Sequence, residues 1–150
     1  MGNRMDVILK EFGQTLGCDE LTFDEHGYCC LFFDDIVVNL EVNEKTEQLF
    51  LYSNIGDIPK DVNTELYEKL LEGNFLFQGT SGGTIGMDKT AGIFSLAWQG
   101  PFIEMGAAAF EMILENFVNL TEHWRGIVKD LSSSPGSGDS LPGFPQGIRV

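Results

Sequence analysis

The sequence predicts an α+β fold within a single domain, and three patterns point to it. Apolar residues in the last third of the chain recur at spacings of three and four, which is typical of an amphipathic helix. The segment 36–42 alternates apolar and polar side chains, as a strand with one solvated face does. A glycine-rich stretch at 79–86 follows a second helical pattern and precedes two short strand patterns. The predicted order is helix, antiparallel β-meander, helix, β-hairpin and C-terminal helix.

The first predicted element is a helix over 3–16. Ile8, Phe12 and either Thr15 or Leu16 recur at helical spacing, and Leu9 widens the apolar face that they form. Gly17 follows directly, and glycine commonly ends a helix because it adopts a left-handed backbone without strain.

Strands are expected next, joined by short polar turns into an antiparallel meander. They are predicted at 21–24, 28–33, 36–42 and 48–55. The strand at 28–33 is apolar on both faces, whereas a strand buried on one side alternates. We therefore expect a helix, a second subunit or a ligand to cover its second face.

A second helix is predicted over 62–75, and a hairpin is predicted from 84–88 and 93–98. The last helix is expected to begin at Pro101, because the missing N–H of proline is not needed in a first turn. Its predicted apolar stripe consists of Phe110, Ile113, Phe117, Leu120, Trp124, Ile127 and Leu131. The stripe fits a coiled-coil seam or a core-facing helix, and the short elements before it favour the core.

Composition limits the classes of partner. The 150 residues include 9 basic and 23 acidic side chains, which gives a net charge of −14 and a pI near 4.2. Such a charge repels phosphate backbones and anionic lipid, so we expect no nucleic-acid partner. Two readings of the acidity remain open: a surface that keeps the protein soluble, or a surface that attracts a basic partner.

The cysteines and the N-terminus indicate a reducing compartment. The chain has three cysteines, Cys18, Cys29 and Cys30. Because their number is odd and two of them are adjacent, a disulfide framework is not expected. The N-terminal residues lack the apolar core of a signal peptide, and no run is long and apolar enough to span a bilayer. A cytosolic protein is therefore expected.

The chain shows no convincing catalytic, metal or cofactor motif. The stretch 79–86 lacks the Gly-Lys-Ser/Thr ending of a phosphate loop and leads into a strand, so we interpret it as a backbone turn. His26, Cys29 and Cys30 lack a second ligand pair for zinc. The adjacent acids at 34–35 are interpreted as a solvated turn. We expect no cofactor, no metal and no enzymatic activity.

An ordered set of motifs resembles the CesT/SycE-like (Tir chaperone) family of class I type III secretion chaperones. The motifs are 23–27 (FDEHG), 31–35 (LFFDD), 67–74 (YEKLLEGN), 82–88 (GGTIGMD), and the pair Phe117 and Trp124. The resemblance covers roughly 3–131. We accordingly expect a chaperone domain over 1–131 and a flexible tail, rich in Ser, Gly and Pro, over 132–150.

The resemblance implies a homodimer in the bacterial cytosol. Such a protein binds the non-globular N-terminal segment of secreted effectors, keeps it competent for secretion and delivers it to the export apparatus. The export ATPase and regulatory proteins are further implied partners. The implied client-binding residues are Ile8, Phe12, Phe32 and Val37. The implied dimer-interface residues are Leu66, Leu70, Phe77 and Trp98.

Two alternatives stay open at this point. A regulatory adaptor of the same fold would couple secretion to gene expression. A small-molecule-binding protein or enzyme would require a deep pocket lined by polar groups with shifted pKa values.

Overall fold

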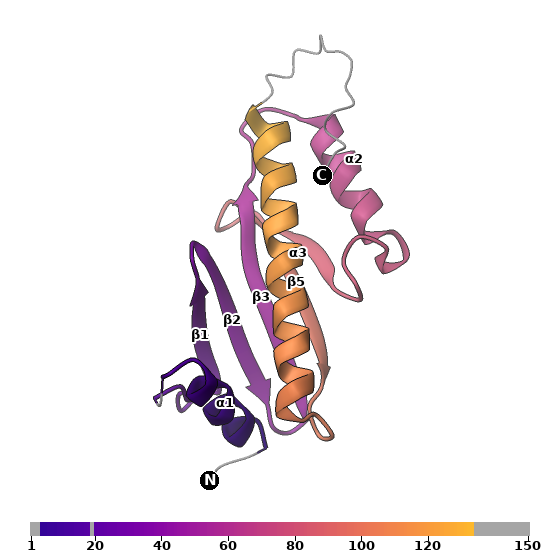
Figure 1. Cartoon of the computed structure of the whole chain (residues 1–150). Helices are drawn as coiled ribbons and strands as arrows, with labels where there is room; N and C mark the ends of the chain where they lie inside the picture. The colour runs from indigo at the N-terminus through magenta and orange to yellow at the C-terminus, as the bar shows by residue number, and fades with distance from the viewer. Residues whose placement is uncertain (1–3, 19, 134–150) are drawn as a thin grey trace. The chain divides into compact units, whose positions relative to one another are not determined.

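The computed structural model describes residues 4–18 and 20–133. Along this part of the chain, the helices and strands follow one another in the predicted order (Figure 1). The elements are α1 (Arg4–Thr15), β1 (Tyr28–Phe33), β2 (Ile36–Asn43), β3 (Gln48–Asp57), α2 (Thr64–Asn74), the 3₁₀ turn η1 (Phe75–Phe77), β4 (Thr84–Asp88), β5 (Ile93–Pro101) and α3 (Ala107–Ser133). The α+β class is confirmed.

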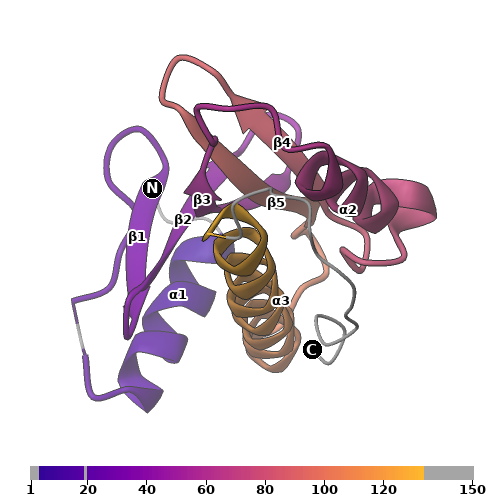
Figure 2. The same cartoon turned by 90° about the horizontal axis from the view of Figure 1, so that it is seen from above.

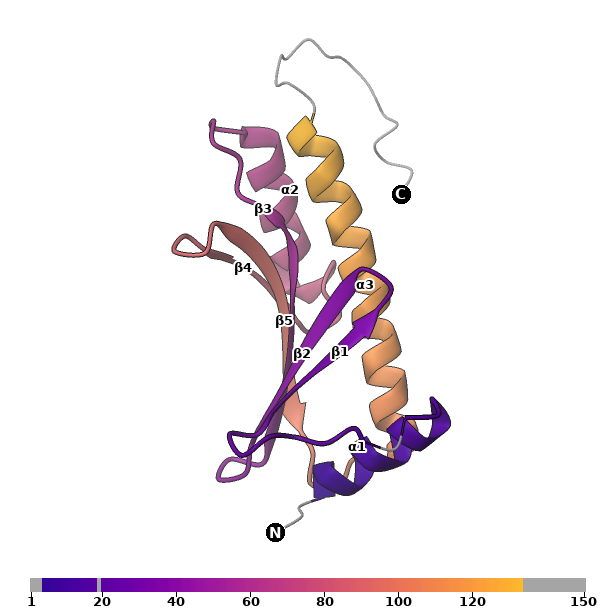
Figure 3. The ribbon, with the colours of Figure 1, turned by 90° about the vertical axis from the view of Figure 1, so that its left-hand side faces the viewer.

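The strands form one five-stranded sheet with the order β1-β2-β3-β5-β4. The β1–β2 and β2–β3 pairs are antiparallel, as the predicted meander requires. The residues at 34–35 make the tight turn between β1 and β2, as predicted. Asp34 has φ 59° there, and aspartate tolerates this left-handed conformation better than most residues do. Figure 3 shows the β1–β2 hairpin from the side.

The chain forms two compact units. The first consists of the chain up to Ser53 together with Ala97–Asn119, and the second consists of Asn54–Leu96 together with the chain from Leu120. The strands β3 and β5 and the helix α3 therefore contribute residues to both units.

In the first unit, α1 lies beside the first turns of α3 (Figures 1 and 2). The rings of Phe12 and Phe110 meet edge to face, with centroids 5.5 Å apart and planes at 84°. Arg4 Nε donates a hydrogen bond of 2.7 Å to the carbonyl oxygen of Met105. The apolar core of this unit includes Met5, Leu9, Val38, Leu40, Leu49, Leu51, Phe110 and Leu114, all buried.

In the second unit, α2 lies beside the later turns of α3 (Figure 3). Asn63 caps α2, because its Oδ1 accepts a 3.1 Å hydrogen bond from the N–H of Leu66. Its Nδ2 donates a 3.0 Å bond to the carbonyl of Leu131 in α3. A Cβ atom added at Gly73 would lie 2.4 Å from the ring of Trp124. The absence of a side chain at Gly73 therefore lets α2 approach α3 closely.

The apolar stripe of α3 faces the core, which decides between the two predicted arrangements. Phe110, Phe117 and Trp124 are buried, as predicted. The other buried positions of the stripe are Leu114, Thr121 and Val128. The predicted residues at the positions next to these, Ile113, Leu120, Ile127 and Leu131, are half-buried.

One predicted strand and one predicted helix boundary were wrong. The segment 21–24 is not a strand, because Asp24 closes a tight loop: its N–H donates to the carbonyl of Tyr28 (2.9 Å). The last helix does not begin at Pro101, which instead ends β5. Phe102 and Met105 are buried, and the N–H of Phe102 donates to the carbonyl of Glu47 (3.1 Å). The N–H of Met105 donates to the carbonyl of Phe102 (3.0 Å), so a turn follows β5 and α3 starts at Ala107.

The predicted tail lies outside the described residues from position 134 onward. The helix α3 extends through Ser133, slightly beyond the predicted end of the folded domain.

Candidate functional site

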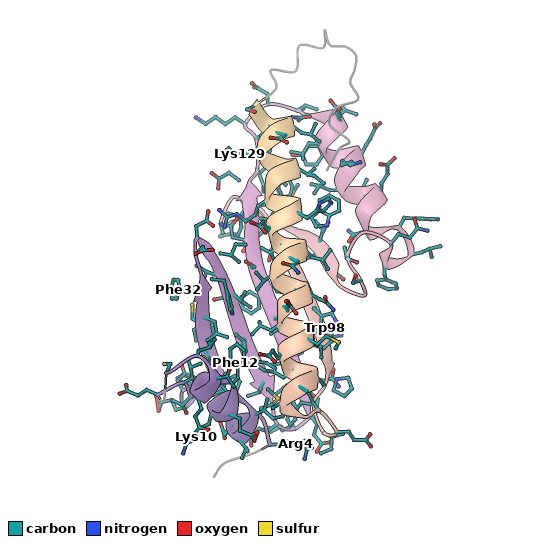
Figure 4. The ribbon with its side chains drawn as sticks, in the orientation of Figure 1. Arg4, Lys10, Phe12, Phe32, Trp98 and Lys129 are labelled. Carbon is teal, nitrogen blue, oxygen red and sulfur yellow. The ribbon has the colours of Figure 1, made fainter. Side chains whose placement is uncertain are left out.

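The four predicted client-binding residues lie in the first unit, in two different environments. Ile8 and Phe12, on α1, are only 4% and 6% exposed. Phe32 is 71% exposed, and Figure 4 shows it pointing away from the sheet. Val37 is half-buried and lies directly opposite Phe32 in the β1–β2 register. The structure therefore brings Phe32 and Val37 together at the surface, whereas Ile8 and Phe12 have little surface to offer a partner.

Ile8 also contributes to a surface depression of about 580 Å³ between α1 and the start of α3. Its lining residues are Arg4, Val7, Ile8, Glu11, Met105, Gly106 and Ala107. Val7 is 56% exposed, so this region adds apolar surface next to the buried face of α1.

The outward-facing side of β1, β2 and the first part of β3 forms a second surface, which we call the open face. Alternate residues of a strand share a face, and the registers align these residues across the three strands. The open face consists of Tyr28, Cys30, Phe32, Val37, Asn39, Glu41, Phe50 and Tyr52, all half-buried or exposed. The alternating pattern of β2 made this face predictable.

Hydrogen bonds order the polar side chains of the open face. The hydroxyl of Tyr28 donates to Asn39 Oδ1 at 2.5 Å, and Asn39 Nδ2 donates to the carbonyl of Tyr52 at 3.1 Å. The hydroxyl of Tyr52 donates to the Glu41 carboxylate. Burial raises the pKa of both tyrosines, and the Glu41 carboxylate raises the pKa of Tyr52 further. Each hydroxyl reaches a residue diagonally across the strand pair, so the two rings lie along the face.

Three of the four predicted dimer-interface residues lie in the second unit. Leu66 and Leu70 are 0% and 5% exposed, which places them in the core of the chain itself. Phe77 is 58% exposed. Trp98 belongs to the first unit and is half-buried, and its ring leaves no room for a Cβ at Gly100.

Phe77 belongs to a cluster that we call the apolar turn: Leu71, Phe75, Leu76 and Phe77. These side chains are 69%, 62%, 69% and 58% exposed. Leu76 and Phe77 have φ values of 52° and 60°, a left-handed backbone that costs a non-glycine residue roughly 1–2 kcal/mol. The sequence signal for this feature is an apolar triplet between the polar residues Asn74 and Gln78, where a helical stripe would have ended.

Hydrogen bonds on both sides fix the apolar turn. The N–H of Gly79 donates to the carbonyl of Gly73 (2.9 Å), and Trp124 Nε1 donates to the carbonyl of Gly79 (2.8 Å). Asn74 bonds both backbone groups of Ile85 on β4, at 2.8 and 2.9 Å. The exposed apolar side chains therefore project from a well-anchored loop.

The phosphate-loop and zinc-site candidates from the sequence do not form such sites in the part of the chain that the structure describes. The glycine-rich stretch is a backbone turn, as predicted, in which Thr80 Oγ1 donates to the carbonyl of Gly83 at 2.8 Å. His26 is exposed and lies 3.7 Å from the Glu25 carboxylate. Within residues 4–18 and 20–133, no three His, Cys, Asp or Glu side chains gather as a metal ion would require. No helix in this part of the chain has both the length and the apolar character to cross a bilayer.

Comparison with known proteins identifies the family. The Tir chaperone of Citrobacter freundii is 23% identical over 123 residues, covering 82% of this chain and 78% of that protein. In the ExsC–ExsE complex, the matching chain has 25% identity and a TM-score of 0.71, covering 87% of this chain and 95% of that one. The HopA1–SchA chaperone–effector complex gives 21% identity and a TM-score of 0.68, covering 81% and 93% of the respective chains. Because the model of the Tir chaperone protein (CesT) family matches residues 7–125, the chain belongs to that family.

Proposed function

We propose that this protein is a type III secretion chaperone of the bacterial cytosol. It binds the non-globular N-terminal segment of one or more secreted effectors, keeps that segment competent for secretion and delivers it to the export apparatus. The observation that carries the proposal is the family match over residues 7–125. A chain of similar fold occurs in the HopA1–SchA chaperone–effector complex, which supports an effector as partner.

The physical work of such a chaperone is binding, not catalysis. Ordering each residue of an unfolded client costs about 1–2 kcal/mol, and burial of apolar surface must offset that cost. The exposed side chains of Val7 and Phe32 supply surface of this kind. The proposed mechanism uses no cofactor and no covalent chemistry.

We propose in addition that two copies associate through the apolar turn. Its four side chains are exposed on an anchored loop, and an exposed apolar patch of this kind commonly marks an interface. Phe77 keeps its predicted role in this arrangement. Leu66 and Leu70 contribute indirectly, because these buried side chains hold α2 in place and do not themselves contact the second copy. Trp98 remains a candidate contact from the first unit.

The chaperone proposal is tested by co-expressing the tagged protein with secreted proteins encoded near it in the source genome. We expect a stable complex with two chaperone copies and one client, in which the N-terminal segment of the client is protected from protease. A protein that binds no such client, and whose absence leaves secretion unchanged, would refute the proposal.

The dimer is tested by light scattering with Phe77→Ser. Wild type is expected at twice the chain mass of 16.6 kDa, and the variant is expected to shift toward a single chain. The matched control is Val62→Ser, because Val62 is 87% exposed in the same unit but lies outside the apolar turn. A variant that stays fully dimeric would place the interface elsewhere.

A further inference from the structure

The open face has an apolar end. Phe32 and Val37 are paired across β1 and β2, and Phe32 is the most exposed aromatic side chain of the first unit, at 71%. An isolated exposed apolar residue needs no explanation, but here the exposed Phe32 and the half-buried Val37 together adjoin a row of ordered polar groups. This end can contact an apolar side chain of a partner.

The open face also has an acidic position at a fixed separation from that end. Glu41 lies on β2, four residues beyond Val37 on the same face, which corresponds to about 13 Å at 3.3 Å per residue. Its carboxylate is exposed and accepts a hydrogen bond from the Tyr52 hydroxyl. This bond restrains the carboxylate and leaves its other acceptor positions for a donor from outside.

Charge favours a cation as that donor. Glu41 is the single charged residue among the eight residues of the open face, and none of them is Lys or Arg. The net charge of −14 adds a long-range attraction for basic partners. An ammonium or guanidinium group from a partner would therefore find an ordered carboxylate without a competing cation from the same face.

We infer that the open face selects a client segment by a basic residue that contacts Glu41 and an apolar residue, four positions away, that contacts Phe32 and Val37. In an extended chain, residues i and i+4 point to the same side, and their separation equals that of Glu41 and Val37. This inference rests on the proposed function and specifies the chemistry of the client. Glu41 sets the preference, and Phe32 provides contact area without discriminating charge.

The spacing rule is tested with short blocked peptides and the full-length protein, by NMR titration. The probe peptide is a Ser/Thr-rich nonapeptide with lysine and leucine four residues apart. One control peptide replaces the lysine with norleucine, and another places lysine and leucine three residues apart, so that they point to opposite sides. We expect the probe to bind about three to five times more tightly than either control, the upper range for an exposed ion pair.

Matched variants test whether Glu41 causes the preference for lysine and whether Phe32 supplies the apolar contact. Glu41→Gln should bind the probe and the norleucine peptide equally, whereas Glu115→Gln, a charge-matched change at an exposed position of α3, should keep the preference. Phe32→Ser should weaken the probe and the norleucine peptide by the same factor, and Met112→Ser, at a 63% exposed position, should weaken neither. Absence of binding, or a preference that survives Glu41→Gln, would overturn the inference.

Alkylation of the cysteines separates this inference from the proposed function. Cys30 is a half-buried residue of the open face, and Cys18 is exposed outside it. In the purified complex with a secreted client, iodoacetamide should modify Cys30 at least several-fold more slowly than in the free protein, with Cys18 unchanged. A complex that forms but leaves Cys30 fully reactive would refute the open-face inference and leave the chaperone proposal standing. Failure to form any client complex would refute the chaperone proposal itself.

Discussion

In the second unit, the buried indole of Trp124 on α3 packs against Gly73 of α2 and against Gly79 in the glycine-rich turn. Its ring fills the space above Gly73 and Gly79, and its Nε1 donates to the carbonyl of Gly79. The helical spacing of the apolar stripe favoured a core position for Trp124, and burial of the side chain confirms it. The two glycines that make room for the ring are 51 and 45 positions away in sequence, so no local pattern could reveal the contact.

Gly73→Ala tests this contact. A Cβ at this position would lie 2.4 Å from the Trp124 ring, so the variant should lose about 1–3 kcal/mol of unfolding free energy through overpacking. Urea unfolding measures the loss. Gly86→Ala is the control, because its Cβ would meet nothing within 4 Å. Equal stability of the two variants would show that the ring can move aside.

Tyr52 makes stability depend on alkaline pH. Burial and the Glu41 carboxylate raise its pKa above the ordinary value of 10.0, so the folded state holds the phenolic proton more tightly than the unfolded state. The contribution of the protonated Tyr52 hydroxyl to the free energy of unfolding is therefore complete below about pH 10, and it declines as the pH rises further. Tyr52→Phe should flatten the decline in unfolding free energy measured by urea titration above about pH 10. An unchanged slope would mean that other groups cause the decline.

At the level of elements, the helix α2 depends on Asn63 for two separate bonds. Asn63→Ala removes the cap of α2 and the bond to Leu131, and should cost about 0.5–2 kcal/mol from the cap alone. Asn63→Asp keeps an acceptor for the N–H of Leu66 but loses the donor to Leu131. Thermal unfolding should rank wild type above the Asp variant and the Asp variant above the Ala variant. Equal stability of the two variants, both well below wild type, would make the Leu131 bond, which both variants lose, the dominant one.

Periodicity predicted the longer elements, and tertiary contacts decided the short ones. The segments β2 and α3 were predictable because several alternating or helically spaced apolar residues agree within each of them. At 21–24 and 101–106, the local pattern was too short, and the outcome depends on hydrogen bonds to Tyr28 and Glu47. The exposure of Phe32, the burial of Ile8 and the left-handed backbone of the apolar turn likewise depend on packing partners that are distant in sequence.

One sequence-based expectation about the candidate site stays a prediction. The strand β1 is apolar on both faces, and we expected its second face to need a cover. In the described chain Phe32 stands 71% exposed on that face. The residue that would cover it remains a prediction, which the peptide titrations address.

For the whole molecule, the net charge of −14 opposes compaction. Salt screens repulsion beyond about 10 Å at 0.1 M, so the melting temperature should rise as sodium chloride is added. Differential scanning fluorimetry measures the rise. Glu111→Lys, at an exposed position of α3, should reduce the salt dependence because it lowers the net negative charge by two. A melting temperature that falls with salt would indicate that attractive ion pairs dominate instead.

The chain contains two tryptophans, and each unit holds one of them: Trp98 in the first and Trp124 in the second. Replacing either by phenylalanine would leave a single intrinsic fluorophore that reports on one half of the protein. Coincident emission changes from the two single-tryptophan variants during denaturation would show that the halves melt cooperatively. Separate midpoints would reveal an intermediate in which one half has lost its structure while the other persists.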